Sequence, residues 1–408
     1  MPKKFFSRSK TRNCYRFALA LFYFSQGIVF ASWASRIPDI RDALGMNEAM
    51  LGSLLFCLPA GQLLTMAITG WAVERFGSRA MVATATLFYP LALVLISLST
   101  SVTQLALSML SLGITANMAN IAINTQAIGI QNLYHRRSIM ATFHGIWSMA
   151  GLSGGLVGSL FVTLQISPFI HFCVIYVLTL LINLTMRTSL LPRDIKRFTK
   201  NNEQVADQQD GQKTVAVKDN HRFSFLIDRY LLILGFIAFG SMTCEGTMFD
   251  WSGVYYEDIV QPPKYLARLG YVASMFTMMS GRFIADYMIT RFGVINILKC
   301  SGITITTGLL TATIFPYITT ATIGFMLIGF GVSAVVPIVY SLSGRSKKLN
   351  SGTALAIVST VGMLGFLIGP PIIGFIAYVL NLRWSLGIIS LMGIFITIFA
   401  TVISKEIE

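Results

Sequence analysis

Twelve stretches of about 20 mostly apolar residues run along this chain, and that is the length an α-helix needs to cross a membrane. They lie at residues 17–36, 50–72, 80–99, 103–129, 139–163, 168–190, 229–253, 267–289, 295–316, 320–343, 352–380 and 384–403. Only 12% of the 408 residues are charged and 54% are hydrophobic, too few polar side chains to cover a water-soluble globule of this size. The sequence therefore predicts an all-α membrane protein with twelve transmembrane helices.

The twelve stretches fall into two groups of six. Residues 191–228 between them are polar and charged and lack helical apolar periodicity, as is typical of a flexible linker. We therefore predict six-helix bundles at 17–190 and 229–403, a basic segment at 1–16 and a short tail at 404–408. The basic start could belong to a signal peptide, but the run after it has the length of a spanning helix, so we expect it to be retained.

The distribution of basic residues predicts the orientation of the chain. If both termini are cytoplasmic, all but five of the 31 Lys and Arg residues lie on the cytoplasmic side, as the positive-inside rule requires. The exceptions are Arg36, Arg41, Lys264, Arg268 and Arg383. We expect a multi-pass protein of the bacterial inner membrane that acts as a monomer. The net charge of +14 does not indicate nucleic-acid binding, because the bases lie between apolar runs.

The two groups of six also resemble each other in sequence. Trp33 and Trp251 each precede a Leu-Gly pair at the same spacing, and the segment LGITANMANI aligns at that same offset with FGVSAVVPIV. Six-helix halves related as parallel repeats bind their solute at the interface between the halves. The sequence therefore predicts two pseudo-repeats with a central site.

A Gly-rich charged turn between the second and third stretches has a counterpart in the second half. The residues are Gly70, Glu74, Arg75, Gly77 and Arg79 in the first half, and Arg282, Asp286, Arg291 and Gly293 in the second. Glycines permit a tight turn, and the acid and the arginines can pair with each other and with helix dipoles. We predict a charged latch that gates the cytoplasmic face; the alternative is a plain turn that obeys the positive-inside rule.

This turn resembles the signature of the major facilitator superfamily, although Glu74 replaces an aspartate and Ser78 a base. Stretches such as WASRIPDIRDALG and NTQAIGIQ resemble a bacterial branch of that superfamily, the rhizopine-associated (MosC-like) membrane proteins. The resemblance implies a secondary transporter with twelve helices that works by alternating access. It also implies a small polar, sugar-like solute.

Polar residues inside the apolar stretches are candidates for a solute cavity. They are Gln26, Trp33, Asn117, Asn120, Asn124, Trp147 and Ser148. The three asparagines share one helix face, so they either line a hydrated cavity or form hydrogen bonds between helices. Trp33 and Trp251 lie near the outer ends of their helices, where anchoring at the membrane interface is the alternative to a cavity role.

Three residues are candidates for proton coupling: Glu245, Asp250 and His144. Glu245 lies well inside its stretch, where burial disfavours the charged form and so favours proton binding. The alternative is an ion pair with Arg36, which would keep Glu245 charged. His144 is either a proton acceptor or a core or cavity-lining residue.

The sequence shows no nucleotide-binding motif, metal cluster or nucleophile–base pair, so we expect neither an enzyme nor a cofactor. The leading prediction is a transporter whose partners are a small solute, protons and the lipid bilayer. The alternatives are a drug efflux pump and a solute sensor that does not transport.

Overall fold

The computed structural model describes residues 12–131, 133–134, 140–192, 228–344, 346, 349 and 351–407. The predicted linker and the first eleven residues of the basic segment therefore lie largely outside the described residues. The described residues contain helices and no β-strand. The helices before the linker are α1 (Arg12–Ala43), α2 (Glu48–Leu55), α3 (Cys57–Phe76), α4 (Ser78–Ser97), α5 (Val102–Gln131), α6 (Met140–Thr163), α7 (Pro168–Met186) and η1 (Arg187–Ser189). Those after it are α9 (Arg229–Asp250), α10 (Ser252–Tyr255), η3 (Tyr256–Val260), η4 (Lys264–Leu266), α11 (Leu269–Phe292), α12 (Val294–Ile314), α13 (Ile318–Ser343), α14 (Ser351–Val379), α15 (Leu382–Ile389) and α16 (Leu391–Ile407).

Eleven helices or helix pairs among the described residues are long and apolar enough to cross a membrane, one fewer than predicted. The segment that falls short is α11, which has 24 residues but carries Arg282 and Asp286 together with several hydroxyl residues. Its length is that of a spanning helix, and its polar residues lower its mean hydropathy. The apolar windows alone therefore support eleven spans.

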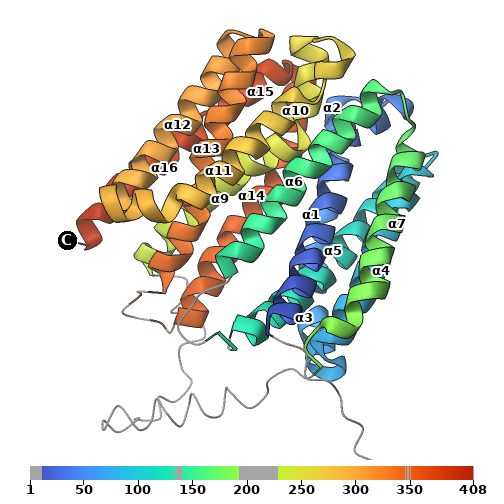
Figure 1. Cartoon of the computed structure of the whole chain (residues 1–408). Helices are drawn as coiled ribbons and strands as arrows, with labels where there is room; N and C mark the ends of the chain where they lie inside the picture. The colour runs from blue at the N-terminus through green and yellow to red at the C-terminus, as the bar shows by residue number, and fades with distance from the viewer. Residues whose placement is uncertain are drawn as a thin grey trace, which may run out of the picture.

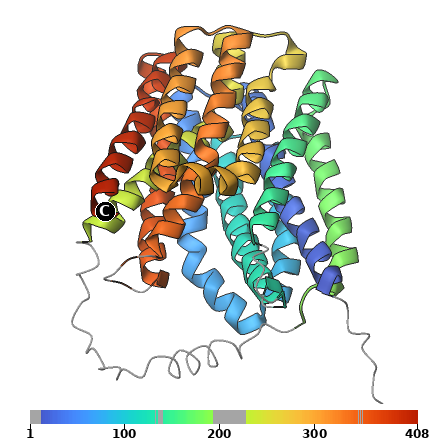
Figure 2. The same ribbon diagram turned by 60° about the vertical axis from the view of Figure 1, so that its left-hand side comes forward.

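The long helices run between two ends of one bundle (Figures 1 and 2). We call the end at which α7 finishes and α9 begins the linker end, and the opposite end the far end. In Figure 1, the helices before residue 192 lie on one side of the molecule and those after residue 228 on the other. We refer to these two sets as the first and second halves.

The repeated turn has the same backbone geometry in both halves. Gly77 ends α3 with φ of 87°, and Gly293 ends α11 with φ of 80°. Each donates its backbone N–H to the carbonyl four residues earlier, Val73 and Ile289 respectively. A positive φ is costly for residues other than glycine, so the matched glycines in the sequence have a matched structural reason.

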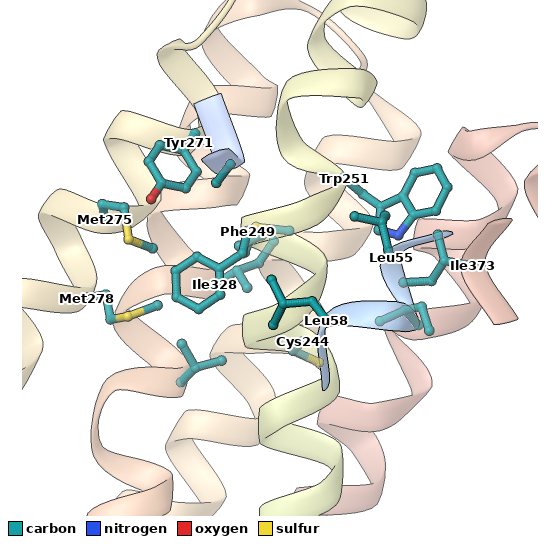
Figure 3. Close-up of a cluster of buried hydrophobic side chains, with 14 of the residues drawn as sticks. Leu55, Leu58, Cys244, Phe249, Trp251, Tyr271, Met275, Met278, Ile328 and Ile373 are labelled. Carbon is teal, nitrogen blue, oxygen red and sulfur yellow. The ribbon is translucent and has the colours of Figure 1, made fainter. Parts of the chain in front are cut away.

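The two halves pack tightly at the far end. A Cβ atom added to Gly52 of α2 would lie 2.7 Å from the carbonyl oxygen of Pro370, and one added to Gly374 of α14 would lie 2.4 Å from the carbonyl oxygen of Glu48. Glycine therefore lets the backbones of these two helices touch. Below this crossing, Leu55 and Leu58 of the first half join Phe249 and Trp251 of the second in one buried cluster (Figure 3).

Candidate functional site

A cavity of about 600 Å³ lies between the two halves. The first half contributes residues of α1 to α6, and the second contributes residues of α9, α11, α13 and α14. Trp33 and Asp250 line it toward the far end, and Asp286, Ile289 and Tyr340 line it toward the linker end. The predicted site between the pseudo-repeats thus coincides with a real cavity.

Glu245, Arg282 and Ser148 form a hydrogen-bonded group in this cavity. Arg282 Nη2 donates to Glu245 Oε1 at 2.9 Å, and Arg282 Nη1 donates to Ser148 Oγ at 2.6 Å. Glu245 lies on α9 and Arg282 on α11, whereas Ser148 lies on α6 of the first half. One guanidinium group therefore connects the central carboxylate to the opposite half.

This arrangement corrects two expectations. Glu245 does not pair with Arg36, whose guanidinium instead donates to His171 Nδ1, the Ile166 carbonyl and Asp39 at the far end. Arg282 is not part of a cytoplasmic turn, because it lies in the cavity about three helical turns before Gly293. The sequence similarity between the two charged turns suggested the wrong position for Arg282, because the spacing of a motif does not show how far each residue lies from the end of the bundle.

Aromatic rings form the wall beside this group. Phe30, Trp147 and Phe249 contact one another, with ring centroids 5.0 Å apart for Phe30–Phe249, 6.1 Å for Phe30–Trp147 and 6.3 Å for Trp147–Phe249. All three line the cavity, as do the predicted residues Gln26 and His144. His144 also makes an edge contact with the ring of Tyr23. The cavity is therefore amphipathic, with apolar faces and few polar groups.

The three asparagines of α5 have different surroundings. Asn117 is buried and does not line the cavity; its amide donates to Thr69 Oγ1 at 3.2 Å and to Thr65 Oγ1 at 3.4 Å on α3. Asn120 does line the cavity. Asn124 accepts from the Tyr23 hydroxyl at 2.8 Å and donates to Asn120. Asn117 therefore packs against α3 in this structure, because its register turns it toward that helix.

Trp33 and Trp251 are not interface anchors. They are 1% and 0% exposed, and both belong to the core between the halves. Trp33 lines the cavity, and among the described residues its indole Nε1 has no hydrogen-bond partner. Asp250 also lines the cavity, and no described residue forms a hydrogen bond or ion pair with its carboxylate.

Ion pairs between the halves close the far end. Arg268, next to α11, binds Asp39 of α1 at 2.7 Å and also binds Glu257 of η3. Arg41 of α1 forms a two-point pair with Asp258 of η3, one contact of which measures 2.8 Å. Four charged groups that the sequence analysis did not name as site residues, Arg268, Asp39, Arg41 and Asp258, therefore join the halves, and Glu257 binds Arg268 within the second half.

A signal for this network exists in the sequence. Asp39 and Glu257 stand at the same distance along the chain after Trp33 and Trp251, so they are equivalent in the two pseudo-repeats. Burial raises the pKa of the Glu257 carboxyl, while the neighbouring Arg268 charge acts in the opposite direction. Closing the far end thus removes charged groups from water, and the ion pairs with the two arginines offset that cost.

The remaining residues of the charged turns lie at the linker end. Glu74 and Arg75 are exposed, Gly70 lies near them in the last turns of α3, and Arg79 donates to the Arg187 carbonyl at 3.1 Å. In the second half, Arg291 donates to the Tyr287 hydroxyl, and Asp286 is an exposed residue at the cavity edge.

Among the described residues, no three His, Cys, Asp or Glu side chains are placed to hold a metal ion.

Comparison with known proteins agrees with this architecture. The sequence model of the Major Facilitator Superfamily matches residues 17–348 and 267–406. The chain is 30% identical to the membrane protein MosC of Rhizobium meliloti, covering 93% of this chain and 88% of MosC. It is 28% identical to an uncharacterised MFS-type transporter of Yersinia pestis, covering 94% of each chain.

Solved structures show the same fold at lower identity. The nucleoside transporter NupG superimposes with a TM-score of 0.72 at 14% identity, covering 96% of this chain and 99% of NupG. A D-xylose-proton symporter gives a TM-score of 0.69 at 15% identity, covering 94% and 97%. With a family match along nearly the whole sequence and this two-halved helical fold, the chain belongs to the Major Facilitator Superfamily of membrane transporters and is not an enzyme.

Proposed function

We propose that this protein is a secondary active transporter that moves a small polar solute across the bacterial inner membrane by alternating access, driven by protons. In this proposal α11 is the twelfth span and both termini are cytoplasmic, so the linker end faces the cytoplasm. The distribution of basic residues supports that orientation. The names of the structural neighbours, a nucleoside transporter and a sugar–proton symporter, support a small polar solute.

The closed far end supports alternating access. The pairs Arg268–Asp39 and Arg41–Asp258 join the halves beyond the cavity, and the cavity lining extends toward the linker end as far as Tyr340. This corresponds to an inward-facing state. Exposure of the cavity to the periplasm would require these pairs to separate and the linker end to close.

The bond from Arg282 to both Glu245 and Ser148 is the single observation that carries the proposal of proton coupling. A protonated Glu245 has no negative charge to hold Arg282, so its protonation weakens the contact that reaches α6 of the first half. Proton binding and the relative position of the halves are thereby linked. Glu245 is the proposed proton site, and His144 and Asp250 are neighbours in the same cavity.

Proteoliposomes test the proposal. Purified protein would be reconstituted and screened with sugars, polyols, nucleosides and small amines for uptake driven by an imposed pH gradient. Glu245→Gln, which mimics the protonated acid, should abolish gradient-driven accumulation and preserve counterflow exchange. Glu48→Gln, an acid outside the cavity, is the matched control and should behave like the wild type.

Two outcomes would contradict the proposal. Accumulation by the Glu245→Gln variant in response to the pH gradient would exclude Glu245 as the coupling site. Binding of a solute with neither uptake nor exchange would identify a sensor instead of a transporter.

A further inference from the structure

The cavity holds a carboxylate that the proposed coupling does not use. Asp250 and Glu245 both lie on α9 and both line the cavity, but only Glu245 has an arginine partner. The carboxylate of Asp250 has no hydrogen bond or ion pair with a described residue. A carboxylate away from bulk water is costly unless a counter-charge or donor neutralises it. This carboxylate is therefore available to a counter-charge or donor on a bound solute.

An unpartnered donor lies at the same level of the cavity. Helix α1 runs beside the end of α9 and the following helix α10 in the same direction, since Phe30 contacts Phe249 of α9 and Pro38 lies against Gly253 of α10. Trp33 and Asp250 each lie just beyond the Phe30–Phe249 contact, toward the far end. The Trp33 indole is 1% exposed, and its Nε1 has no described hydrogen-bond partner. This N–H is therefore free to donate to an acceptor that a bound solute supplies.

The charge balance of the cavity favours one class of solute. Its charged lining consists of Glu245, Asp250 and Asp286 against Arg282, and the arginine already binds Glu245. An anion entering here would meet uncompensated negative charge, whereas a cation would neutralise Asp250. The rings of Phe30, Trp147 and Phe249 line the same cavity, and the faces of aromatic rings attract cations.

We propose that Asp250 binds a protonated amine of the transported solute, while the Trp33 N–H donates to an oxygen next to that amine. This assignment rests on the proposed transport function and specifies its substrate class. Asp250 and Glu245 then have separate roles: Asp250 contacts the solute, and Glu245 carries the coupling proton. The aromatic wall packs against the carbon frame of the solute.

A matched series of ring compounds tests the proposal by binding alone. The probes are 2-aminocyclohexanol, cyclohexane-1,2-diol and 2-hydroxycyclohexanecarboxylate, which have similar shapes and are cationic, neutral and anionic. Each is added to the purified full-length protein, and the shift in Tm is measured, because a ligand that binds only the folded state raises Tm. The amine should raise Tm, and the diol and the acid should have little effect.

Variants assign the effect to the residue. Asp250→Asn should lose the shift caused by the amine, Asp250→Glu should keep part of it, and Trp33→Phe should reduce it. Asp42→Asn, which removes an acid outside the cavity, should keep the full shift. If Asp250→Asn does not fold, two results still test the proposal. They are the size of the Tm shift that each of the three probes causes in the wild-type protein, and the reduction of the amine's shift in Trp33→Phe.

Several results would overturn the assignment. They are equal or greater stabilisation by the diol or the acid, no stabilisation by the amine, an undiminished shift in Asp250→Asn, and loss of the shift in Glu245→Gln but not in Asp250→Asn. Each of these results would contradict only the assignment of Asp250 to the solute amine. Proton-driven uptake in liposomes tests the proposed transport function separately, so failure of the assignment can be distinguished from failure of the proposed function.

Discussion

Arg268 donates to Asp39 at 2.7 Å, and this contact joins the second half of the protein to the end of α1 in the first half. The arginine is 1% exposed, and it also binds Glu257 and the Ser35 carbonyl. Asp39 and Glu257 are equivalent positions of the two pseudo-repeats, so one guanidinium group binds both copies of a repeated acid. The ion pairs of Arg268 at the far end therefore use the same acidic position from each of the two pseudo-repeats.

Arg268→Ala should open the far end. The substitution leaves Asp39 and Glu257 without their shared counter-charge, so the closed arrangement loses stability. The measurement is the labelling rate of a cysteine introduced at Ala34 after the five native cysteines are replaced by serine, using a thiol reagent that does not cross membranes and is added outside cells. Arg383→Ala is the control, because Arg383 also lies at the far end but donates only to carbonyls of α12, within its own half. Equal labelling rates in the two variants would contradict the prediction.

Ser148→Ala should weaken the contact between Arg282 and the first half. The loss of one hydrogen bond between membrane helices averages about 0.6 kcal/mol, so a small decrease in Tm is expected. The matched control is Ser153→Ala on the same helix, because Ser153 donates to the Met149 carbonyl of its own helix. An identical Tm for the Ser148 and Ser153 variants would show that the contact does not stabilise this state.

Asn117→Ala and Asn120→Ala should have different effects, although the two residues lie on one face of α5. Asn117 joins α5 to α3, so its removal should lower Tm and leave solute affinity unchanged. Asn120 lines the cavity, so its removal should weaken solute binding, by about 1–3 kcal/mol if a buried partner is left unsatisfied. Both quantities can be measured once a solute is found. Loss of affinity in the Asn117 variant alone would reverse this assignment.

Gly374→Ala should prevent full closure of the far end. The added Cβ would lie 2.4 Å from the Glu48 carbonyl oxygen, so α2 and α14 would have to move apart. Gly387→Ala is the control, because no atom lies within 4 Å of its added Cβ. The Ala34 cysteine labelling described above should increase in the Gly374 variant only. Unchanged labelling would mean that the helices can tolerate the methyl group.

The sequence allowed the membrane spans and the repeat to be predicted, because both depend on local features. Apolar windows and turn glycines such as Gly77 and Gly293 need no knowledge of distant neighbours. The stretch at 267–289 was predicted as a span from its apolar residues, but the helix found there, α11, carries polar residues that leave it outside the count of eleven. The cavity also lies at the predicted interface between the halves.

The individual site residues could be predicted less well. Asn117 and Asn120 have the same chemistry and share a helix face, so only the position of α3 separates a packing residue from a cavity residue. The partner of Glu245 lies 37 positions along the chain and on another helix, in a motif that suggested a surface turn. Side-chain partners between helices depend on rotation and depth, which a single sequence does not specify.

The contact between Gly52 and Gly374 has a consequence for the motion of the halves. Helices that interdigitate their side chains must disengage ridges from grooves before they can slide. At this crossing the backbones touch without side chains between them. Neither glycine has a side chain that would block a small sliding or rotation of α14 against α2, so this crossing is suited to act as the pivot about which the two halves turn.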